Sequence, residues 1–256
     1  MANRYVGMKI LMLDIETAPT IAGVWSLFKV NVAINQILQS GHTLCFAARW
    51  LHEPKNKYIF KSVYHDGEEK MLDTMWDLLD EADVVMHFNG KKFDIPIINR
   101  EFIKNNYLPP SPYSHIDLLM VVRRQFKFVS NKLDFVCKEL GIGSKVQHKG
   151  MDLWWGCLEN DKSSWATMKR YNIQDIHLLQ PLYEKLLPWI PNHPNRALWM
   201  EPGSSLICPS CGGTDLRFKG YKVTRVVRYR HYRCNGCGSY PRERQKADAK
   251  RLDVAA

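Results

Sequence analysis

Two acidic residues near the amino terminus have a spacing that suits metal-dependent chemistry. Asp14 and Glu16 stand at the end of the apolar run 8–15, two positions apart. Side chains two apart on a strand share a face, so the carboxylates would lie side by side, about 7 Å apart along the chain. Such a like-charged pair is costly unless a cation lies between the two groups. The alternative is that the strand exits to solvent here.

A second candidate segment links an apolar strand-like run to a helix. Asn89 and Asp94 lie in this linker, and a loop at the carboxyl end of a strand can present both to a ligand at the sheet edge. Lys91 and Lys92 lie between them and are placed to contact phosphate. The alternative for Asp94 is a structural helix N-cap, which Pro96 in the first turn favours.

The third candidate is a carboxylate in the apolar stripe of the last long helix, predicted over residues 164–187. Asp175 falls in that stripe, and a carboxylate on the core-facing side of a helix needs a partner. Tyr171 precedes it by four residues, so both side chains lie on one helical face. The alternative is a buried ion pair between Asp175 and a nearby basic residue.

Together the three segments resemble the DEDD superfamily of 3′→5′ exonucleases, in the branch whose third motif is YxxxD. The resemblance covers roughly residues 8–188, with LDIET and FNGKKFD as first and second motifs. It implies an RNase H-like fold and an enzyme that hydrolyses phosphodiester bonds. It also implies that Tyr171 orients the attacking water and that Asn89 contacts substrate or supports Asp94. The implied ligands of two Mg²⁺ or Mn²⁺ ions are Asp14, Glu16, Asp94 and Asp175.

This chemistry agrees with what four acidic groups can do. Converging carboxylates supply the hard oxygen ligands that Mg²⁺ and Mn²⁺ prefer. Two such ions about 3.5 to 4 Å apart stabilise both the attacking and the leaving oxygen of a phosphodiester hydrolysis. The catalytic set is therefore expected to be Asp14, Glu16, Asp94, Tyr171 and Asp175.

Four of the seven cysteines form two CxxC pairs, separated by 22 residues, near the carboxyl terminus. Cys208, Cys211, Cys234 and Cys237 have the spacing of a four-cysteine zinc ribbon, and a glycine follows each pair. A module of about 40 residues has too little core to fold unaided, so one structural Zn²⁺ should supply most of its stability.

Between the two cysteine pairs, residues 216–223 and 225–233 are predicted to form a hairpin that interleaves basic and aromatic side chains. Guanidinium groups pair with phosphates and aromatic faces accept bases, which favours nucleic-acid binding. The expected substrate contacts on this hairpin are Arg228, Arg230 and Arg233. The alternative is a solvated basic hairpin that binds acidic groups of a protein.

The elements that must position these residues alternate between strands and helices. We expect an α/β fold: an RNase H-like mixed sheet flanked by helices, plus a small zinc-ribbon β module. The segment 18–41 fits neither helical nor strand periodicity. The predicted strands cover residues 8–15, 43–50, 58–64 and 83–88, and the predicted helices cover 68–81, 95–106, 133–140 and 164–187, with a further apolar segment at 116–122.

Charge divides the chain as the motifs do. The net charge is +10, from 36 Lys and Arg against 26 Asp and Glu. From Gly203 onward there are 12 basic and 4 acidic residues, or +8, which leaves +2 for the first 202 residues. We expect an exonuclease domain at 1–200, a zinc ribbon at 201–241 and a basic flexible tail at 242–256. The sequence shows no signal peptide and no apolar run that could span a membrane, so a soluble cytoplasmic protein is expected.

The resulting expectation is a metal-dependent 3′→5′ exonuclease acting on single-stranded nucleic acid, with DNA preferred and the ribbon aiding binding. A polymerase or another replication or repair protein is a candidate partner. One alternative is a structure-specific endonuclease of the same fold. The other is a non-catalytic nucleic-acid-binding adaptor that uses the ribbon alone.

Overall fold

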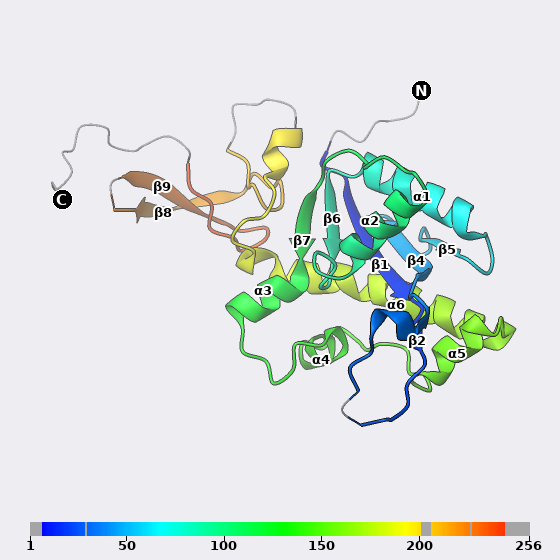
Figure 1. Ribbon diagram of the computed structural model, residues 1–256. Coiled ribbons are helices and arrows are strands. Elements are labelled where there is room, and N and C mark those ends of the chain that lie inside the picture. Colours follow the sequence, from blue (N-terminus) through cyan, green and yellow to red (C-terminus); the bar gives the residue numbers. More distant parts are fainter. Residues whose placement is uncertain (1–6, 29, 201–205, 226, 244–256) are drawn as a thin grey trace. The chain divides into compact units, whose positions relative to one another are not determined.

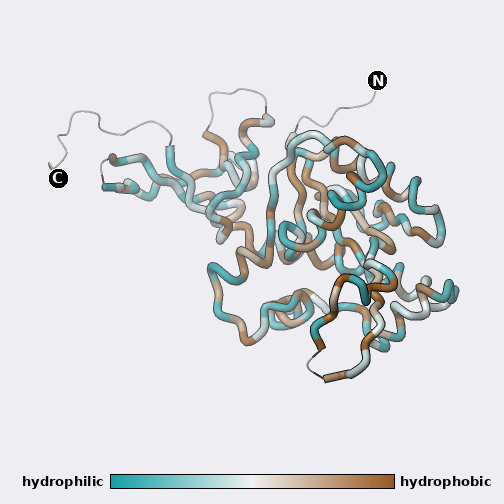
Figure 2. Tube along the Cα trace, viewed as in Figure 1, coloured by the Kyte–Doolittle hydropathy of each residue, from teal (hydrophilic) through white to brown (hydrophobic). Residues whose placement is uncertain are grey.

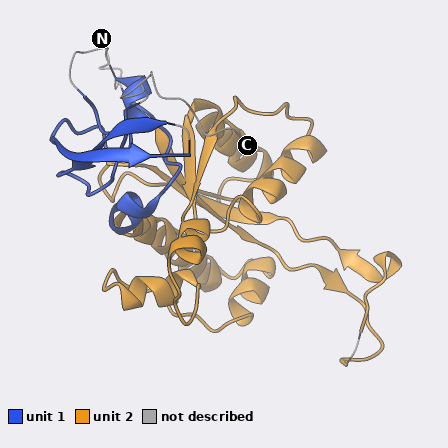
Figure 3. Cartoon of the chain, turned by 90° about the vertical axis from the view of Figure 1, so that its left-hand side faces the viewer, with its two compact units in different colours: residues 1–8, 184–256 blue, residues 9–183 orange. Residues whose placement is uncertain are grey.

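The structure, a computed structural model, describes residues 7–28, 30–200, 206–225 and 227–243. The chain divides into two compact units (Figures 1 and 3). One comprises residues 9–183, and the other comprises residues 184–256 together with 1–8.

The larger unit is built on one five-stranded mixed sheet in the order β5-β4-β1-β6-β7. β1 pairs antiparallel with β4 and parallel with β6, β4 pairs antiparallel with β5, and β6 pairs parallel with β7. β1 is thus the central strand, at the point where antiparallel pairing gives way to parallel pairing. The strands are β1 (Ile10–Thr17), β4 (Thr43–Trp50), β5 (Ile59–Ser62), β6 (Val84–His87) and β7 (Ser114–Asp117).

Helices cover both faces of this sheet, with α1 and α2 on one face and α6 on the other (Figure 1). The α-helices are α1 (Glu68–Glu81), α2 (Asp94–Lys104), α3 (Leu118–Gln125), α4 (Leu133–Glu139), α5 (Asp152–Leu158) and α6 (Lys162–Leu186). Short 3₁₀ helices lie at Ile34–Gln36, Leu187–Trp189 and Arg196–Trp199.

The alternation of β1 side chains creates two cores and directs the acidic residues. Leu11, Leu13 and Ile15 pack into the core under α1 and α2. The side chains between them, including Asp14 and Glu16, therefore point to the opposite face. On that face Trp165, Met168 and Tyr171 of α6 pack with α5 and β4. The two carboxylates thus emerge at the end of a buried surface covered by α6.

Between β1 and β4 the described residues of the segment 18–41 form an arm, and most of its large apolar side chains are exposed. It contains the two-stranded ladder of β2 (Ile21–Ala22) and β3 (Ile37–Gln39), and the Gln36 side chain bonds to Gly23 O and Ala33 N. Trp25 is 101% exposed, and Leu27 and Phe28 are 88% and 85% exposed. Apolar residues recur along this arm in Figure 2. The mixed periodicity of the segment agrees with this exposure, because Ala18 at its start is the one apolar residue of the described arm that joins a core cluster.

The smaller unit contains a hairpin of β8 (Leu216–Val223) and β9 (Arg228–Cys234), paired antiparallel from Leu216–Cys234 to Val223–Arg228. Residues 241–243 run along the other edge of β9, where Tyr232 N donates to Pro241 O and Glu243 N donates to Arg230 O. Arg242 and Glu243, assigned to the tail in the sequence analysis, are therefore paired with this hairpin. The rest of the predicted tail, residues 244–256, lies outside the described residues.

The α/β fold class predicted from the sequence is confirmed, with two differences in detail. The apolar segment 116–122 divides into the end of β7 and the start of α3, because the Asp117 side chain accepts from Leu119 N and caps the helix. The helix α5 was not predicted; it contains Gly156 and is only seven residues long. No helix in the described part of the chain is long and apolar enough to cross a membrane.

Candidate active site and zinc-binding site

Three carboxylates predicted from two distant segments of the chain meet at the carboxyl end of β1. The pairing of β1 with β6 ends at Met12–Met86, so the following residues are free of that neighbour. Asp14, Glu16 and Asp175 each offer an oxygen, and these three atoms lie within 4.8 Å of one another. The central strand supplies two of the groups and α6 supplies the third.

Asn172, a residue that sequence analysis did not assign to the site, holds Asp14 in place. Its side-chain amide donates to Asp14 Oδ2 at 2.7 Å and to the Asp14 carbonyl at 3.2 Å. Asn172 is 0% exposed, and its own Oδ1 accepts from Cys45 Sγ at 3.8 Å. A polar residue next to Tyr171 in a stripe of core positions was the only sequence signal for this role.

Asp94 joins the site in a way that differs from the N-cap alternative. The N-cap residue of α2 is Phe93, and Asp94 is the first helical residue. The buried Asp94 Oδ1 accepts from the Ile15 amide at 3.1 Å, between the two acids of β1. Asp94 lies outside the group of three close carboxylates, but its charge contributes to raising the pKa of Asp14.

Burial raises the pKa values of all four acids, and repulsion from other carboxylates adds to the effect, although Lys145 opposes it at Asp175. Burial is the largest cause in each case. The pKa of Glu16 rises to about 8, with repulsion from Asp175 as the next cause. The pKa values of Asp94 and Asp175 rise to about 6, and that of Asp14 is raised well above its ordinary value. Ionised carboxylates at this site therefore need a positive charge beside them.

The donor set fits a hard divalent cation. All the groups that converge here offer carboxylate oxygens, the ligands that Mg²⁺ and Mn²⁺ prefer. Asp175 Oδ1 is buried and has no hydrogen-bond partner among the described residues. An unpaired buried carboxylate oxygen is costly, and a bound cation removes that cost.

One cation of the chain already contacts this site. Lys145 Nζ lies 2.5 Å from Asp175 Oδ2 and donates to the Tyr171 hydroxyl at 2.9 Å. The Lys145 backbone amide donates to Asp134 Oδ1 of α4 at 2.8 Å, which fixes the loop that carries it. Asp175 therefore does form the ion pair considered as an alternative, yet only through one of its oxygens. No sequence motif marked Lys145.

Tyr171 stands at the edge of the acid cluster. Burial and the charges of Glu16 and Asp175 raise the pKa of its phenol to about 12, so the hydroxyl stays protonated at neutral pH. The His148 ring packs against the Tyr171 ring with centroids 4.9 Å apart. His148 also lines a cavity of about 490 Å³ whose walls include Lys149 and Arg170.

The turn between β6 and α2 is fixed by close contacts. Asn89 has φ 75°, and its backbone amide donates to Asp117 Oδ1 at 2.9 Å. A Cβ on Gly90 would lie 2.5 Å from His87 Cγ, so this position requires glycine. Asp117 thus acts as a helix cap and turn anchor, and the predicted phosphate contacts Lys91 and Lys92 are exposed on this turn.

The four cysteines of the smaller unit form a cluster suited to zinc. All four sulfurs lie within 4.8 Å of one another, with Cys208–Cys237 at 3.7 Å and Cys211–Cys234 at 3.6 Å. Zn–S bonds of about 2.3 Å in a tetrahedron place the sulfurs about 3.8 Å apart. A disulfide requires about 2.05 Å, so the geometry fits a four-thiolate metal site instead.

Each pair of cysteines forms the same turn. The amide of Gly212 donates to Cys208 O and that of Gly238 donates to Cys234 O, both at 2.9 Å. Both glycines have φ 79°, a conformation that side chains disfavour. The matching turns are the two knuckles that the CxxC-Gly spacing predicts.

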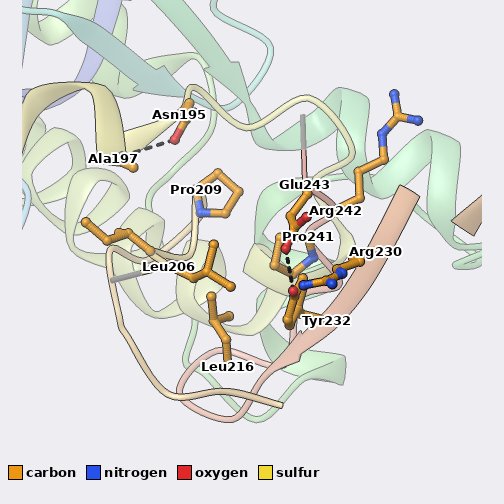
Figure 4. A pocket seen from close by; sticks show the side chains of 11 residues that line it. Asn195, Ala197, Leu206, Pro209, Leu216, Arg230, Tyr232, Pro241, Arg242 and Glu243 are labelled. Atoms are coloured by element: carbon orange, nitrogen blue, oxygen red, sulfur yellow. Dashed lines mark hydrogen bonds between the residues drawn. The ribbon is translucent and has the colours of Figure 1, made fainter. Parts of the chain in front are cut away.

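The three arginines predicted to bind substrate lie on both faces of the hairpin. Alternation along β9 puts Arg228 and Arg230 on one face and Arg233 on the other. Arg228 stacks over the Tyr221 ring at 4.2 Å. Arg230 lines a cavity of about 550 Å³ in the smaller unit (Figure 4).

Comparisons with known proteins agree with this architecture. The structure is similar to that of the family B DNA polymerase from the hyperthermophilic archaeon Pyrobaculum calidifontis, with a TM-score of 0.54 and 17% sequence identity. The similarity covers 71% of this chain and 25% of the polymerase, so the chain spans about a quarter of that protein. None of the curated protein sequences matches.

The RNase H superfamily profile matches residues 38–187, which is more than half of the chain. This range includes Asp94, Tyr171 and Asp175 and begins after the acids of β1. The match and the mixed sheet with its acid cluster lead to one conclusion: the chain belongs to the RNase H superfamily.

Proposed function

We propose that the protein is a 3′→5′ exonuclease that hydrolyses phosphodiester bonds of single-stranded nucleic acid, with DNA preferred. The observation that carries the proposal is the convergence of Asp14, Glu16 and Asp175, with Asp94 bonded to the strand between the first two. This is a site for divalent cations at the end of a central strand, where α/β folds commonly bind ligands.

The acids would hold Mg²⁺ or Mn²⁺ at this site. Asp14, Glu16 and Asp175 are the closest oxygen donors. Asp94 is the fourth carboxylate, and it would act either as a further ligand or through its negative charge alone. When bound, the ions supply positive charge to the attacking and leaving oxygens of the phosphodiester. Asn172 keeps the Asp14 carboxylate in one orientation.

Tyr171 and Lys145 provide the polar edge of the reaction site. Because Lys145 donates to the phenol oxygen, the phenol proton is free to bond to a water molecule. That water attacks phosphorus, the bond from phosphorus to the 3′ oxygen breaks, and that oxygen gains a proton. The products are a nucleoside 5′-monophosphate and a strand shortened by one nucleotide with a new 3′-hydroxyl.

Two features suit a strand that enters this site. The cavity beside His148 carries Lys149 and Arg170 on its walls, which can pair with phosphates. Lys91 and Lys92 are exposed on the turn that leads into Asp94.

In the smaller unit, a zinc-bound ribbon with a basic hairpin would add affinity for the strand. The preference for DNA rests on the similar structure being that of a DNA polymerase.

Digestion of end-labelled single strands tests the proposal. We expect the purified protein with Mg²⁺ or Mn²⁺ to release mononucleotides progressively from the 3′ end of a 5′-labelled DNA strand. Asp14→Asn should abolish this release, whereas Asp77→Asn, an exposed carboxylate on α1, should leave it unchanged. Undegraded DNA with the wild-type protein, or equal rates for the wild type and Asp14→Asn, would overturn the proposal.

Substrate form separates the related activities. An exonuclease leaves circular single-stranded DNA intact, whereas an endonuclease linearises it. RNA of the same sequence, digested in parallel, measures the preference for DNA. Binding without hydrolysis of any strand would instead support a nucleic-acid adaptor.

A further inference from the structure

The two faces of the β8–β9 hairpin carry different side chains. Residues directly opposite each other in an antiparallel pair share a face. The pairings Arg217–Arg233 and Lys222–Tyr229 therefore lie on one face, together with His231. Arg242 pairs with His231 from the neighbouring edge and lies on this face too. We call this surface the basic face; it consists of Arg217, Lys222, Tyr229, His231, Arg233 and Arg242.

The cations of the basic face are exposed and outnumber the one acid at its end, Asp215, whose side chain accepts from Asn235 Nδ2 at 2.9 Å. Arg217, Lys222, Arg233 and Arg242 are all exposed, and none of the described residues paired on this face is acidic. Arg217 and Arg233 stand directly opposite each other, and like charges in that position destabilise a strand pair. An anion bound between the two guanidinium groups would remove this repulsion.

Aromatic rings accompany these cations. The Arg242 guanidinium lies 4.1 Å from the centroid of the Tyr229 ring. The His231 and Tyr240 rings lie 5.5 Å apart. Bases of a single strand stack on such rings without regard to sequence. The face therefore offers partners both for phosphates and for bases.

The opposite face is occupied by other contacts. Arg230 lies beside Tyr232 and Glu243 at the cavity, which Arg242 also lines (Figure 4). Tyr232 donates to Glu243 Oε1 at 2.5 Å, so this face carries an acid. Phe218 packs against Tyr232 with ring centroids 5.8 Å apart. The Arg228 guanidinium is already stacked over Tyr221 on this face, and the acid Glu243 lies there too, so this face is a poorer match for a polyanion than the basic face.

We propose that the basic face binds single-stranded nucleic acid, with phosphates between the cations and bases on the rings. The proposal deepens the proposed function by assigning the strand to one face of the ribbon. From Arg233 to Tyr229 the face extends roughly 13 Å, measured along β9 because β8 has a bulge between Phe218 and Gly220. With a rise of about 3.4 Å per nucleotide in a stacked strand, that length spans several phosphates.

A matched pair of variants tests the choice of face in the full-length chain carrying Asp14→Asn, which keeps the probe intact. R217Q/R233Q and R228Q/R230Q each remove two positive charges from the same hairpin. Binding of fluorescein-labelled (dT)20 is measured by anisotropy at several salt concentrations. We expect R217Q/R233Q to weaken binding by about 10-fold or more at 0.1 M salt and to reduce the log–log salt slope by about 1.4. The proposal gives up the sequence-based expectation that Arg228 and Arg230 contact the strand, because both lie on the face that carries Glu243. R228Q/R230Q should therefore change affinity by less than about twofold.

Additional variants keep the test independent of folding. Zinc content must equal that of the parent protein in each variant. The single substitutions Arg233→Gln and Arg230→Gln compare two exposed arginines of one strand. We expect Arg233→Gln to weaken binding of (dT)20 more than Arg230→Gln does. Tyr229→Leu should weaken binding by about fivefold or more without changing the salt slope, since stacking carries no charge.

The outcomes separate this proposal from the proposed function. Equal losses for the two double variants, or no binding of (dT)20 by the parent, would overturn the assignment of the face. Polyglutamate binding as tightly as (dT)20 would assign the face to acidic protein instead. If the wild type does not hydrolyse DNA while only R217Q/R233Q loses binding, the exonuclease proposal fails and the basic face stands.

Discussion

At the residue scale, the acids of the cluster are held by neighbours of three kinds. An amide from α6 binds Asp14, a backbone amide of β1 binds Asp94, and a lysine from a loop binds Asp175. Each contact satisfies one oxygen and leaves the other side of the group for a cation. The arrangement fixes the carboxylates before any metal is bound.

Removing the amide beside Asp14 should impair catalysis without unfolding the chain. We expect Asn172→Ala to lower kcat by about 10- to 100-fold with a smaller change in KM, since residues that orient metal ligands have effects of this size. The apparent affinity for Mn²⁺ should fall as well. Gln174→Ala is the control, because Gln174 is an amide on the same helix that bonds to Ser144 O. Equal losses for both variants would contradict a specific role for Asn172.

The raised pKa of Glu16 predicts a pH-dependent stability without divalent metal. Its pKa is about 8 in the folded chain and ordinarily 4.5, so the folded state favours the protonated form. The contribution of Glu16 to the free energy of unfolding is therefore fully present below about pH 4.5 and is lost as pH rises toward 8. In buffer free of divalent metals, Tm should fall between pH 6 and pH 8.5. Glu16→Gln should remove much of this fall.

Added Mn²⁺ provides the complementary measurement. A cation stabilises the ionised carboxylates, so Mn²⁺ should raise Tm more at pH 8.5 than at pH 6. A Tm difference between wild type and Glu16→Gln that is independent of pH would contradict this account.

At the element scale, β1 and α6 together position most of the site. Alternation on β1 puts Asp14 and Glu16 on the α6 side, and the helical repeat puts Tyr171, Asn172 and Asp175 over them. The arm after β1 contributes no comparable packing. Its large apolar side chains, such as Trp25, Leu27 and Phe28, are exposed, whereas most of the apolar side chains of β1 and α6 are buried.

Substitutions in the arm should not affect stability. We expect Trp25→Ser and Phe28→Ser to change Tm by less than about 2 °C, because exposed side chains away from special contacts contribute within about 0.5 kcal/mol. Trp165→Ser is the matched control: Trp165 is 1% exposed, and emptying such a position costs about 3 to 5 kcal/mol. Circular-dichroism melts measure all three. A large loss for Trp25→Ser would show that the arm contributes to the folded core.

At the scale of the whole molecule, the last part of the chain differs in charge and in chemistry from the part before it. The last 54 residues hold +8 of the net charge and the four-cysteine cluster. The first 202 residues hold +2 and the carboxylates. A site that binds cations and a module that binds polyanions have opposite electrostatic needs, and the chain separates them along its sequence.

Loss of zinc should therefore affect binding and hydrolysis unequally. We expect Cys208→Ser with Cys211→Ser to abolish zinc binding and to weaken binding of (dT)20 by about 10-fold or more at 0.1 M salt, with a smaller salt slope. The main thermal transition, from residues 9–183, should stay within a few degrees, and trinucleotides should still be hydrolysed. Cys137→Ser, outside the cluster, is the control. Unchanged (dT)20 binding by the zinc-free variant would show that the folded ribbon is not needed to bind the strand.

The sequence by itself determined the features that depend on local spacing. Strand and helix periods, the CxxC-Gly knuckles and the three acidic segments are patterns over a few residues, and they predicted the α/β class and the acidic cluster.

The tertiary structure alone decided which distant groups meet. Asn172 with Asp14, Lys145 with Asp175, and Asp94 with the Ile15 amide are separated by 158, 30 and 79 positions along the chain. No periodicity relates such residues; packing across the sheet does. The division of the hairpin into a basic face and a face with a cavity likewise depends on strand register, and a shift of one residue would exchange the two faces.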